Sequence, residues 1–211
     1  MVEEKGVNLI RNMKIARRLA ITLINISLMV QVVEFVFNIM DAFSFETLFA
    51  FVFEIITNGI LIYALNRKKP VLIEIALIVI KIFEATYYPL RSCQRLDTIT
   101  AIAEVPTFYI VVHIMFAIGA FSLLFGLIFY CVYKVWDSIR FWDIMKIWIV
   151  LASIFMLVNT ILYAVELSKN PDMRWTEILE PIALTILFAG MFVTYEYVEE
   201  AIIYNEEISA T

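Results

Sequence analysis

The sequence contains only one histidine, two cysteines, five glycines and five prolines in 211 residues. A single histidine excludes bis-histidine haem ligation and argues against a zinc hydrolase. Cys93 and Cys131 show no metal-binding or redox spacing, and nucleophile-elbow, Walker and dinucleotide-binding motifs are absent. We therefore predict a protein that is not an enzyme and that carries no cofactor.

Charged residues are also scarce. They make up 18% of the chain, whereas 63% of the residues are hydrophobic and the mean hydropathy is +0.87. Soluble domains carry about 25% charged and about 45–50% apolar residues. The basic residues cluster beside hydrophobic runs, where membrane topology accounts for them, so nothing indicates nucleic-acid binding. The sequence thus predicts an all-α integral membrane protein, with the lipid bilayer of the cell membrane as its first partner.

Six apolar runs are long enough to cross the ~30 Å hydrocarbon core of a bilayer, because each helical crossing needs about 20 apolar residues. They cover residues 19–37, 47–65, 71–88, 106–133, 147–165 and 178–195. The first run follows a basic start but lacks a small-residue cleavage site, so it is interpreted as a retained helix. Short loops connect the runs. The prediction is one polytopic domain over residues 1–211, with a bundle of about six transmembrane helices in residues 19–195.

The distribution of Lys and Arg predicts which side of the membrane each loop faces. With a cytoplasmic N-terminus, the inside segments hold eleven basic residues: Lys5, Arg11, Lys14, Arg17, Arg18, Arg67, Lys68, Lys69, Lys134, Arg140 and Lys146. The outside loops hold four: Arg91, Arg95, Lys169 and Arg174. Both termini are therefore predicted to be cytoplasmic. Residues 1–18 would form a basic amphipathic segment and residues 196–211 an acidic amphipathic tail.

Glycine and proline hardly interrupt the apolar runs. Each proline lies at or near the end of a run: Pro70, Pro89, Pro106, Pro171 and Pro181. Transporters with broken helices usually place Gly or Pro within a span, near the substrate site. Continuous helices make such a transporter less favoured. Residues 135–146 mix aromatic, aliphatic and charged side chains, which predicts a short interfacial helix.

The first and fifth runs match at an offset of 132 residues. Met13-Lys14-Ile15 corresponds to Met145-Lys146-Ile147, Leu19-Ala20 to Leu151-Ala152, and Val33-Glu34 to Val165-Glu166. A parallel repeat of helices 1–2 and 5–6 would explain these matches. Chance agreement between two apolar runs with basic starts is the alternative.

The most unusual feature is a set of acidic residues at membrane depth. An ionised side chain at the centre of a membrane helix costs about 2.5–3.5 kcal/mol, so it needs a partner, water or a proton. On the predicted topology five carboxylates and the histidine share the outer side: Glu34, Glu54, Glu84, Glu166, Glu180 and His113. They either form an outward-facing polar cavity for a cation, a small ligand or a proton relay, or lie at the interface and in helix contacts. The interfacial interpretation suits Glu34, Glu166 and Glu180 best.

Lys81 lies near the middle of the third run, three residues from Glu84 and on the same helix face. The favoured interpretation is a neutralising Lys81–Glu84 pair, joined by Glu54 across the interface. The alternative is a counter-ion for a ligand. The candidate ligand- or ion-binding residues are thus Glu34, Glu54, Lys81, Glu84, His113 and Glu166, with the identity of any metal undetermined.

Two surfaces are candidates for protein contacts. Ala117, Gly119, Ala120 and Gly126 place small residues along the fourth run, which suits close packing within the bundle or a homo-oligomer. The acidic tail is either solvated or docked onto Arg67-Lys68-Lys69, onto the basic N-terminus or onto a protein partner.

Three functions follow from these features. A non-catalytic subunit or sensor-type module is favoured by the continuous helices and the amphipathic tail. A small cation- or proton-coupled transporter is the alternative, because of the carboxylates and Lys81 at membrane depth. An intramembrane enzyme lacks any catalytic motif.

Overall fold

The computed structural model describes residues 2–41, 44–100, 107–135, 141–169 and 175–209. These residues form six long α-helices and one short 3-10 helix, and none of them lies in a β-strand. The helices are α1 (Val2–Asp41), α2 (Phe45–Arg67), α3 (Pro70–Thr100), α4 (Thr107–Val135), α5 (Phe141–Lys169), η1 (Trp175–Ile178) and α6 (Leu179–Ser209). The all-helical prediction is confirmed for this part of the chain.

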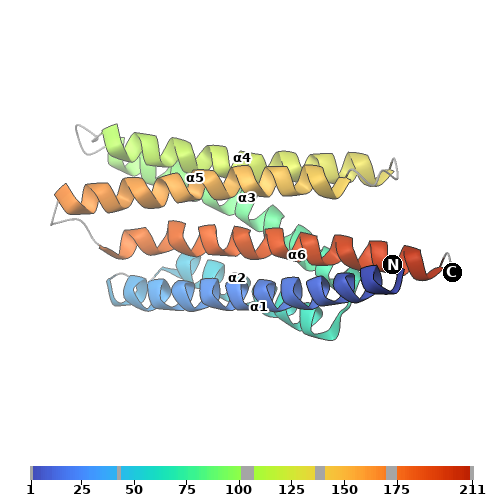
Figure 1. The fold of residues 1–211 in the computed structure, drawn as a ribbon. Coiled ribbons are helices and arrows are strands. Elements are labelled where there is room, and N and C mark those ends of the chain that lie inside the picture. Colours follow the sequence, from blue (N-terminus) through green and yellow to red (C-terminus); the bar gives the residue numbers. More distant parts are fainter. Residues whose placement is uncertain (1, 42–43, 101–106, 136–140, 170–174, 210–211) are drawn as a thin grey trace.

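Each helix packs against the next one along the chain, and α6 closes the cycle by packing against both α5 and α1. The helices run roughly along one direction, with α3 more oblique, and the two chain ends lie at the same end of the bundle (Figure 1). We call this the proximal end. The opposite end, where α1 leads into α2, is the distal end.

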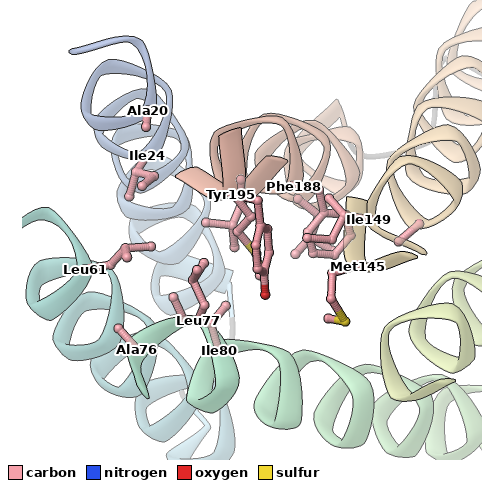
Figure 2. Packing of buried hydrophobic residues seen from close by; sticks show 14 of the residues in the cluster. Ala20, Ile24, Leu61, Ala76, Leu77, Ile80, Met145, Ile149, Phe188 and Tyr195 are labelled. Carbon is pink, nitrogen blue, oxygen red and sulfur yellow. The ribbon is translucent and has the colours of Figure 1, made fainter. Parts of the chain in front are cut away.

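Buried apolar side chains fill the space between the helices. Ile24 of α1, Leu77 of α3, Ile149 of α5 and Phe188 of α6 are at most 1% exposed and belong to one continuous cluster (Figure 2). Figure 2 also shows Tyr195 projecting from α6 toward α3, with its hydroxyl at the tip. The core therefore joins helices from both ends of the sequence.

Large apolar side chains also cover the outside of the bundle, as Met29, Val71 and Ile147 illustrate with exposed fractions of 69%, 67% and 58%. Apolar surface of this extent is unusual for a protein surrounded by water. Four helices among the described residues are long and apolar enough to span a membrane: Val7–Met40, Phe45–Arg67, Met145–Lys169 and Trp175–Tyr204. The helical part of the chain is thus compatible with membrane insertion.

The other two long helices differ from these four. α3 carries Glu74, Lys81 and Glu84 in its apolar half. In α4 the apolar stretch that can be described is Ile110–Gly126, which is shorter than a full crossing.

Local signals explain where α2 begins and ends. The Ser44 side chain accepts a hydrogen bond from the Glu46 N–H at 3.2 Å, which caps the first turn. Lys68 ends the helix in the left-handed conformation, with φ 53°, and its N–H donates to the Leu65 carbonyl. Pro70 then starts α3, where its fixed φ and missing N–H are well tolerated.

Several boundaries differ from the sequence-based expectations. The basic segment 1–18 is continuous with the first span in one helix of 40 residues. α3 continues to Thr100, past the expected end at residue 88, so Pro89 lies within a helix. Within the expected interfacial helix 135–146, residues 136–140 lie outside the described chain, and Phe141–Lys146 begin α5. α6 runs unbroken to Ser209, as the spacing of its apolar residues predicts.

The contact between α1 and α6 is particularly close. The Ser27 hydroxyl of α1 donates to the Ala183 carbonyl of α6 at 2.8 Å. A Cβ added at Gly190 would lie 3.0 Å from Ile24 Cγ1 and 3.4 Å from the Ile24 backbone nitrogen. Only glycine lets the two backbones approach this closely.

Two of the small residues of α4, Gly119 and Gly126, face another helix of the same chain. A Cβ added at Gly119 would lie 2.8 Å from Met156 Cε, and one added at Gly126 would lie 3.0 Å from Trp148 Cβ. Both neighbours belong to α5. These two glycines therefore serve the α4–α5 contact.

The helices compared in the repeat hypothesis bury the same face. Every buried position of α1 coincides, at the offset of 132 residues, with a buried position of α5: Ala20 with Ala152, Ile24 with Met156, Ser27 with Asn159 and Gln31 with Tyr163.

Candidate functional site

A small polar cavity lies at the distal end, between the last turns of α1, the first turns of α2 and one residue of α3. Its lining consists of Gln31, Glu34, Phe35, Asn38, Thr47, Ala50, Phe51, Glu54 and Tyr87. We call it the distal cavity. A water-sized sphere can occupy about 30 Å³ of it, which is enough for one or two water molecules or one small ion.

The two carboxylates of the distal cavity come from facing helices, Glu34 from α1 and Glu54 from α2. Asn38 donates its side-chain N–H to Glu34 Oε1 at 3.2 Å, one turn along α1. The stacked rings of Phe35 and Phe51, with centroids 3.7 Å apart, form an apolar wall beside them. Carboxylate, amide, hydroxyl and phenol oxygens thus share one small space.

A buried amide pair lies at the inner side of this cavity. Asn58 Nδ2 of α2 donates to Gln31 Oε1 of α1 at 3.5 Å, and the two residues are only 1% and 4% exposed. Within the described structure, Gln31 Nε2 and Asn58 Oδ1 have no hydrogen-bond partner. Because an amide presents either its oxygen or its nitrogen after a half-turn, Gln31 can offer an oxygen to a cation.

Glu84 brings a third helix to this region. It is 2% exposed, and its Oε2 has no hydrogen-bond partner among the described residues. The charges that act on it are those of Glu54 from α2 and Glu180 from the first turn of α6. Carboxyl groups from three helices therefore lie within electrostatic reach of one another, where little water can screen their interaction.

Lys81 does not pair with Glu84, so the favoured interpretation of that residue was wrong. Its Nζ donates to the Tyr195 hydroxyl of α6. Lys81 is 1% exposed and Tyr195 is 2% exposed. The long side chain reaches a partner on another helix, which sequence spacing on α3 alone does not reveal.

The structure thus separates the six candidate residues into two groups. Glu34 and Glu54 line the distal cavity, and Glu84 lies within electrostatic reach of Glu54. Lys81 binds Tyr195 instead, and neither it nor His113 on α4 nor Glu166 on α5 lines the cavity. No group of three or more His, Cys, Asp or Glu side chains in the described chain has the arrangement of a metal centre.

Sequence reasoning missed the uncharged polar residues, because it followed formal charge. Gln31, Asn58 and Asn159 are almost fully buried, and both side-chain polar atoms of Asn159 have no hydrogen-bond partner in the described structure. An amide in an apolar run is itself a signal, because burying it without a partner costs free energy. Tyr195 gave no such signal, since tyrosine is common near membrane interfaces.

Glu196 and Glu199, at the start of the acidic tail, make a contact that was not expected from the sequence. At the proximal end, Lys146 of α5 forms ion pairs with Glu196, at 2.7 Å, and with Glu199 of α6. These pairs fasten the extension of α6 to α5, not to Arg67-Lys68-Lys69. The single cysteine whose side chain is described, Cys131, is a free and exposed thiol.

Comparison with known proteins identifies no relative: no protein-family model, curated protein or solved structure matches this chain.

Proposed function

We propose that the chain crosses the membrane six times, with both termini on the cytoplasmic side. The 31 residues of α3 and the 29 residues of α4 extend for about 45 Å at 1.5 Å per residue, enough to cross the bilayer. The excess of basic residues at the proximal end supports the orientation. The distal end then faces outward.

We further propose that the protein is a non-catalytic sensor or complex subunit of the cell membrane that binds a small cation in the distal cavity. The observation that carries this proposal is the convergence of Glu34 and Glu54 on a cavity of about 30 Å³. Two carboxylates with neutral oxygens from Asn38, Thr47 and Tyr87 suit a hard cation that prefers oxygen ligands.

The size and surroundings of the cavity narrow the ligand class. A space of about 30 Å³ excludes a drug-sized organic molecule. Buried Glu84 interacts with Glu54, and a bound cation would stabilise the ionised form of these neighbouring carboxyl groups. Cation binding would therefore stabilise the distal contacts of α1, α2 and α3.

The test is thermal unfolding of the purified chain in mild detergent with a panel of Na⁺, K⁺, Mg²⁺, Ca²⁺, Zn²⁺ and small amines. A ligand at about 100 times its Kd stabilises the folded state by about 2.7 kcal/mol. We expect one cation to raise the Tm of the wild type and to lose most of this effect in the Glu54→Gln and Glu34→Gln variants.

Glu166→Gln is the matched control, because it removes a carboxylate outside the distal cavity. It should keep the full cation response. If no cation stabilises the wild type, or if all three variants lose the response equally, the distal cavity is not a cation site.

A cation- or proton-coupled transporter is the second candidate. It is favoured by polar groups buried beyond the cavity: Glu84 and Lys81 lie one turn apart on α3, and Lys81 reaches Tyr195 of α6. Ionisable residues inside a membrane protein are typical of proton relays and ion pathways. A transporter should show cation or proton flux in proteoliposomes that Glu54→Gln and Lys81→Met abolish, whereas a sensor or subunit should show none.

We also infer that α1–α2 and α5–α6 descend from a duplication. The matching buried positions of α1 and α5 support this inference. If the sequence matches were due to chance, the two helices would have no reason to bury corresponding positions.

A further inference from the structure

A second, much larger cavity opens at the proximal end. It lies where the basic part of α1, the turn between α2 and α3, and the extension of α6 meet, and a water-sized sphere can occupy about 390 Å³ of it. We call it the proximal cavity. Its volume falls in the range of sites for organic ligands, which is about 300–1,000 Å³.

Three cations surround this cavity: Lys14 and Arg17 on α1, and Lys68 at the end of α2. Lys14 and Arg17 are three residues apart and so lie on one face of α1. Arg17 also reaches the Asn66 carbonyl at 3.5 Å, which connects it to the same turn that holds Lys68. Positive charge from two helices therefore converges on one space.

The tail carboxylates that the structure describes do not neutralise these cations. Among the described side chains, the tail carboxylates of Glu196 and Glu199 pair with Lys146, and no carboxylate pairs with Lys14, Arg17 or Lys68. The cavity is thus a mostly apolar space bordered by three basic side chains, which can hold an anionic group at its edge.

The backbone at Lys68 gives an independent indication. This is the one residue other than glycine with positive φ in the described chain, and a left-handed helix cap normally favours glycine. A lysine here places an ammonium group at the cavity despite a less favourable backbone conformation. Such a position is typical of a functional residue.

The rest of the lining is apolar or aromatic: Ile10 and Met13 of α1, and Tyr197 and Tyr204 of α6. Apolar walls do not suit a small inorganic anion, which would lose water without compensation. They suit a molecule with an anionic head and a hydrocarbon body. Exposed Ile10 offers such a body a path to the outside of the bundle.

We propose that the proximal cavity binds an anionic phospholipid of the cytoplasmic leaflet. Lys14, Arg17 and Lys68 hold the phosphate, Tyr197 and Tyr204 border the headgroup, and the acyl chains leave past Ile10 and Met13. Basic pockets between helices on the cytoplasmic side are suited to anionic headgroups, and that leaflet carries most of the anionic lipid. The site is separate from the distal cavity and does not depend on cation binding there.

The experiment adds dioleoyl phosphatidylglycerol, dioleoyl phosphatidylcholine or sodium phosphate to the full chain in detergent, and follows Tm and bound lipid by native mass spectrometry. We expect stabilisation by phosphatidylglycerol alone. The triple variant Lys14→Gln, Arg17→Gln, Lys68→Gln should bind it at least about tenfold more weakly, because each basic group near a lipid surface contributes substantially to affinity.

The matched control is Arg11→Gln, Arg18→Gln, Lys69→Gln, which removes three neighbouring positive charges that do not line the cavity. It should lose less than about twofold in affinity if the site is local and not a general surface potential. Equal losses in both triple variants would overturn the proposal, as would equal binding of phosphatidylcholine. Full displacement of phosphatidylglycerol by inorganic phosphate would instead assign the cavity to a free anion and overturn the lipid assignment.

A single variant distinguishes the loss of lipid binding from a folding defect. Lys68→Gly removes the ammonium but keeps the left-handed turn, which glycine adopts more easily. The lipid-free protein should be at least as stable as the wild type, while affinity for phosphatidylglycerol falls about fivefold. An unchanged lipid response in this variant would show that Lys68 serves only the turn and would overturn the three-cation site.

Discussion

The two ends of the bundle share the same helices but have opposite character. The distal cavity is small, about 30 Å³, and holds carboxylates and amides, whereas the proximal cavity is about 390 Å³ and holds three cations and two tyrosines. α1 contributes to both, with Lys14 and Arg17 at one end and Glu34 at the other. The charge pattern therefore belongs to the bundle and not to any single helix.

The helix dipole does not explain this pattern. α2 has Glu46 in its first turn and Arg67 in its last, which complements its dipole. α1 runs the other way through the bundle, and its Lys14, Arg17 and Glu34 lie outside its first and last turns, where a helix dipole acts. α1 and α2 run in opposite directions, yet both carry basic residues at the proximal cavity and a carboxylate at the distal cavity.

The largest loss of stability is expected at Gly190, where α1 and α6 approach each other closely. Both ends of the bundle depend on this contact. Gly190→Leu forces a side chain against Ile24 and its backbone, and we expect a loss of about 3 kcal/mol in the free energy of unfolding. Both cavities should lose their ligands together. Gly59→Leu is the control, because a Cβ there meets nothing within 4 Å, and unfolding in detergent compares the two.

The second test concerns the hydrogen bond that lies between the two ends. Tyr195→Phe leaves the buried Lys81 ammonium without its acceptor, which should cost about 2 kcal/mol. Adding Lys81→Met should restore most of this loss, since an apolar side chain of similar volume needs no partner. A single variant as stable as the wild type would contradict a role of the pair in stability.

The smallest effect concerns only the proximal end. Lys146→Gln removes the partner of Glu196 and Glu199, whose side chains are 39% and 25% exposed, so we expect a loss of about 1 kcal/mol or less. Amide hydrogen exchange should rise in the α6 extension and stay unchanged at the distal end. Lys169→Gln, on the other end of α5, should leave both unchanged.

The helical fold could be predicted from the sequence, because a long apolar segment in a bilayer has few ways other than an α-helix to satisfy its backbone hydrogen bonds. The ends of the helices were predicted less well. An apolar run ends where the chain leaves the membrane, but the hydrogen-bonded helix can continue beyond that point. α3 therefore continues to Thr100, and α1 already begins at Val2.

The candidate site was predicted in part. Glu34 and Glu54 line one cavity and Glu84 interacts with Glu54, whereas His113 and Glu166 do not line that cavity, because helix rotation decides which side chain meets a cavity. The partner of Lys81 lies 114 residues away in sequence. Contacts of this range depend on how helices assemble, and spacing along one helix does not encode them.

The continuity of α6 has a consequence for regulation. This one unbroken helix carries Glu180 beside the distal carboxylates and Tyr197 and Tyr204 beside the proximal cavity. If occupancy at one end shifts α6, thermodynamic reciprocity requires the two ligands to change each other's affinity by the same factor. The lipid composition of one leaflet would then set the ion sensitivity of the opposite face.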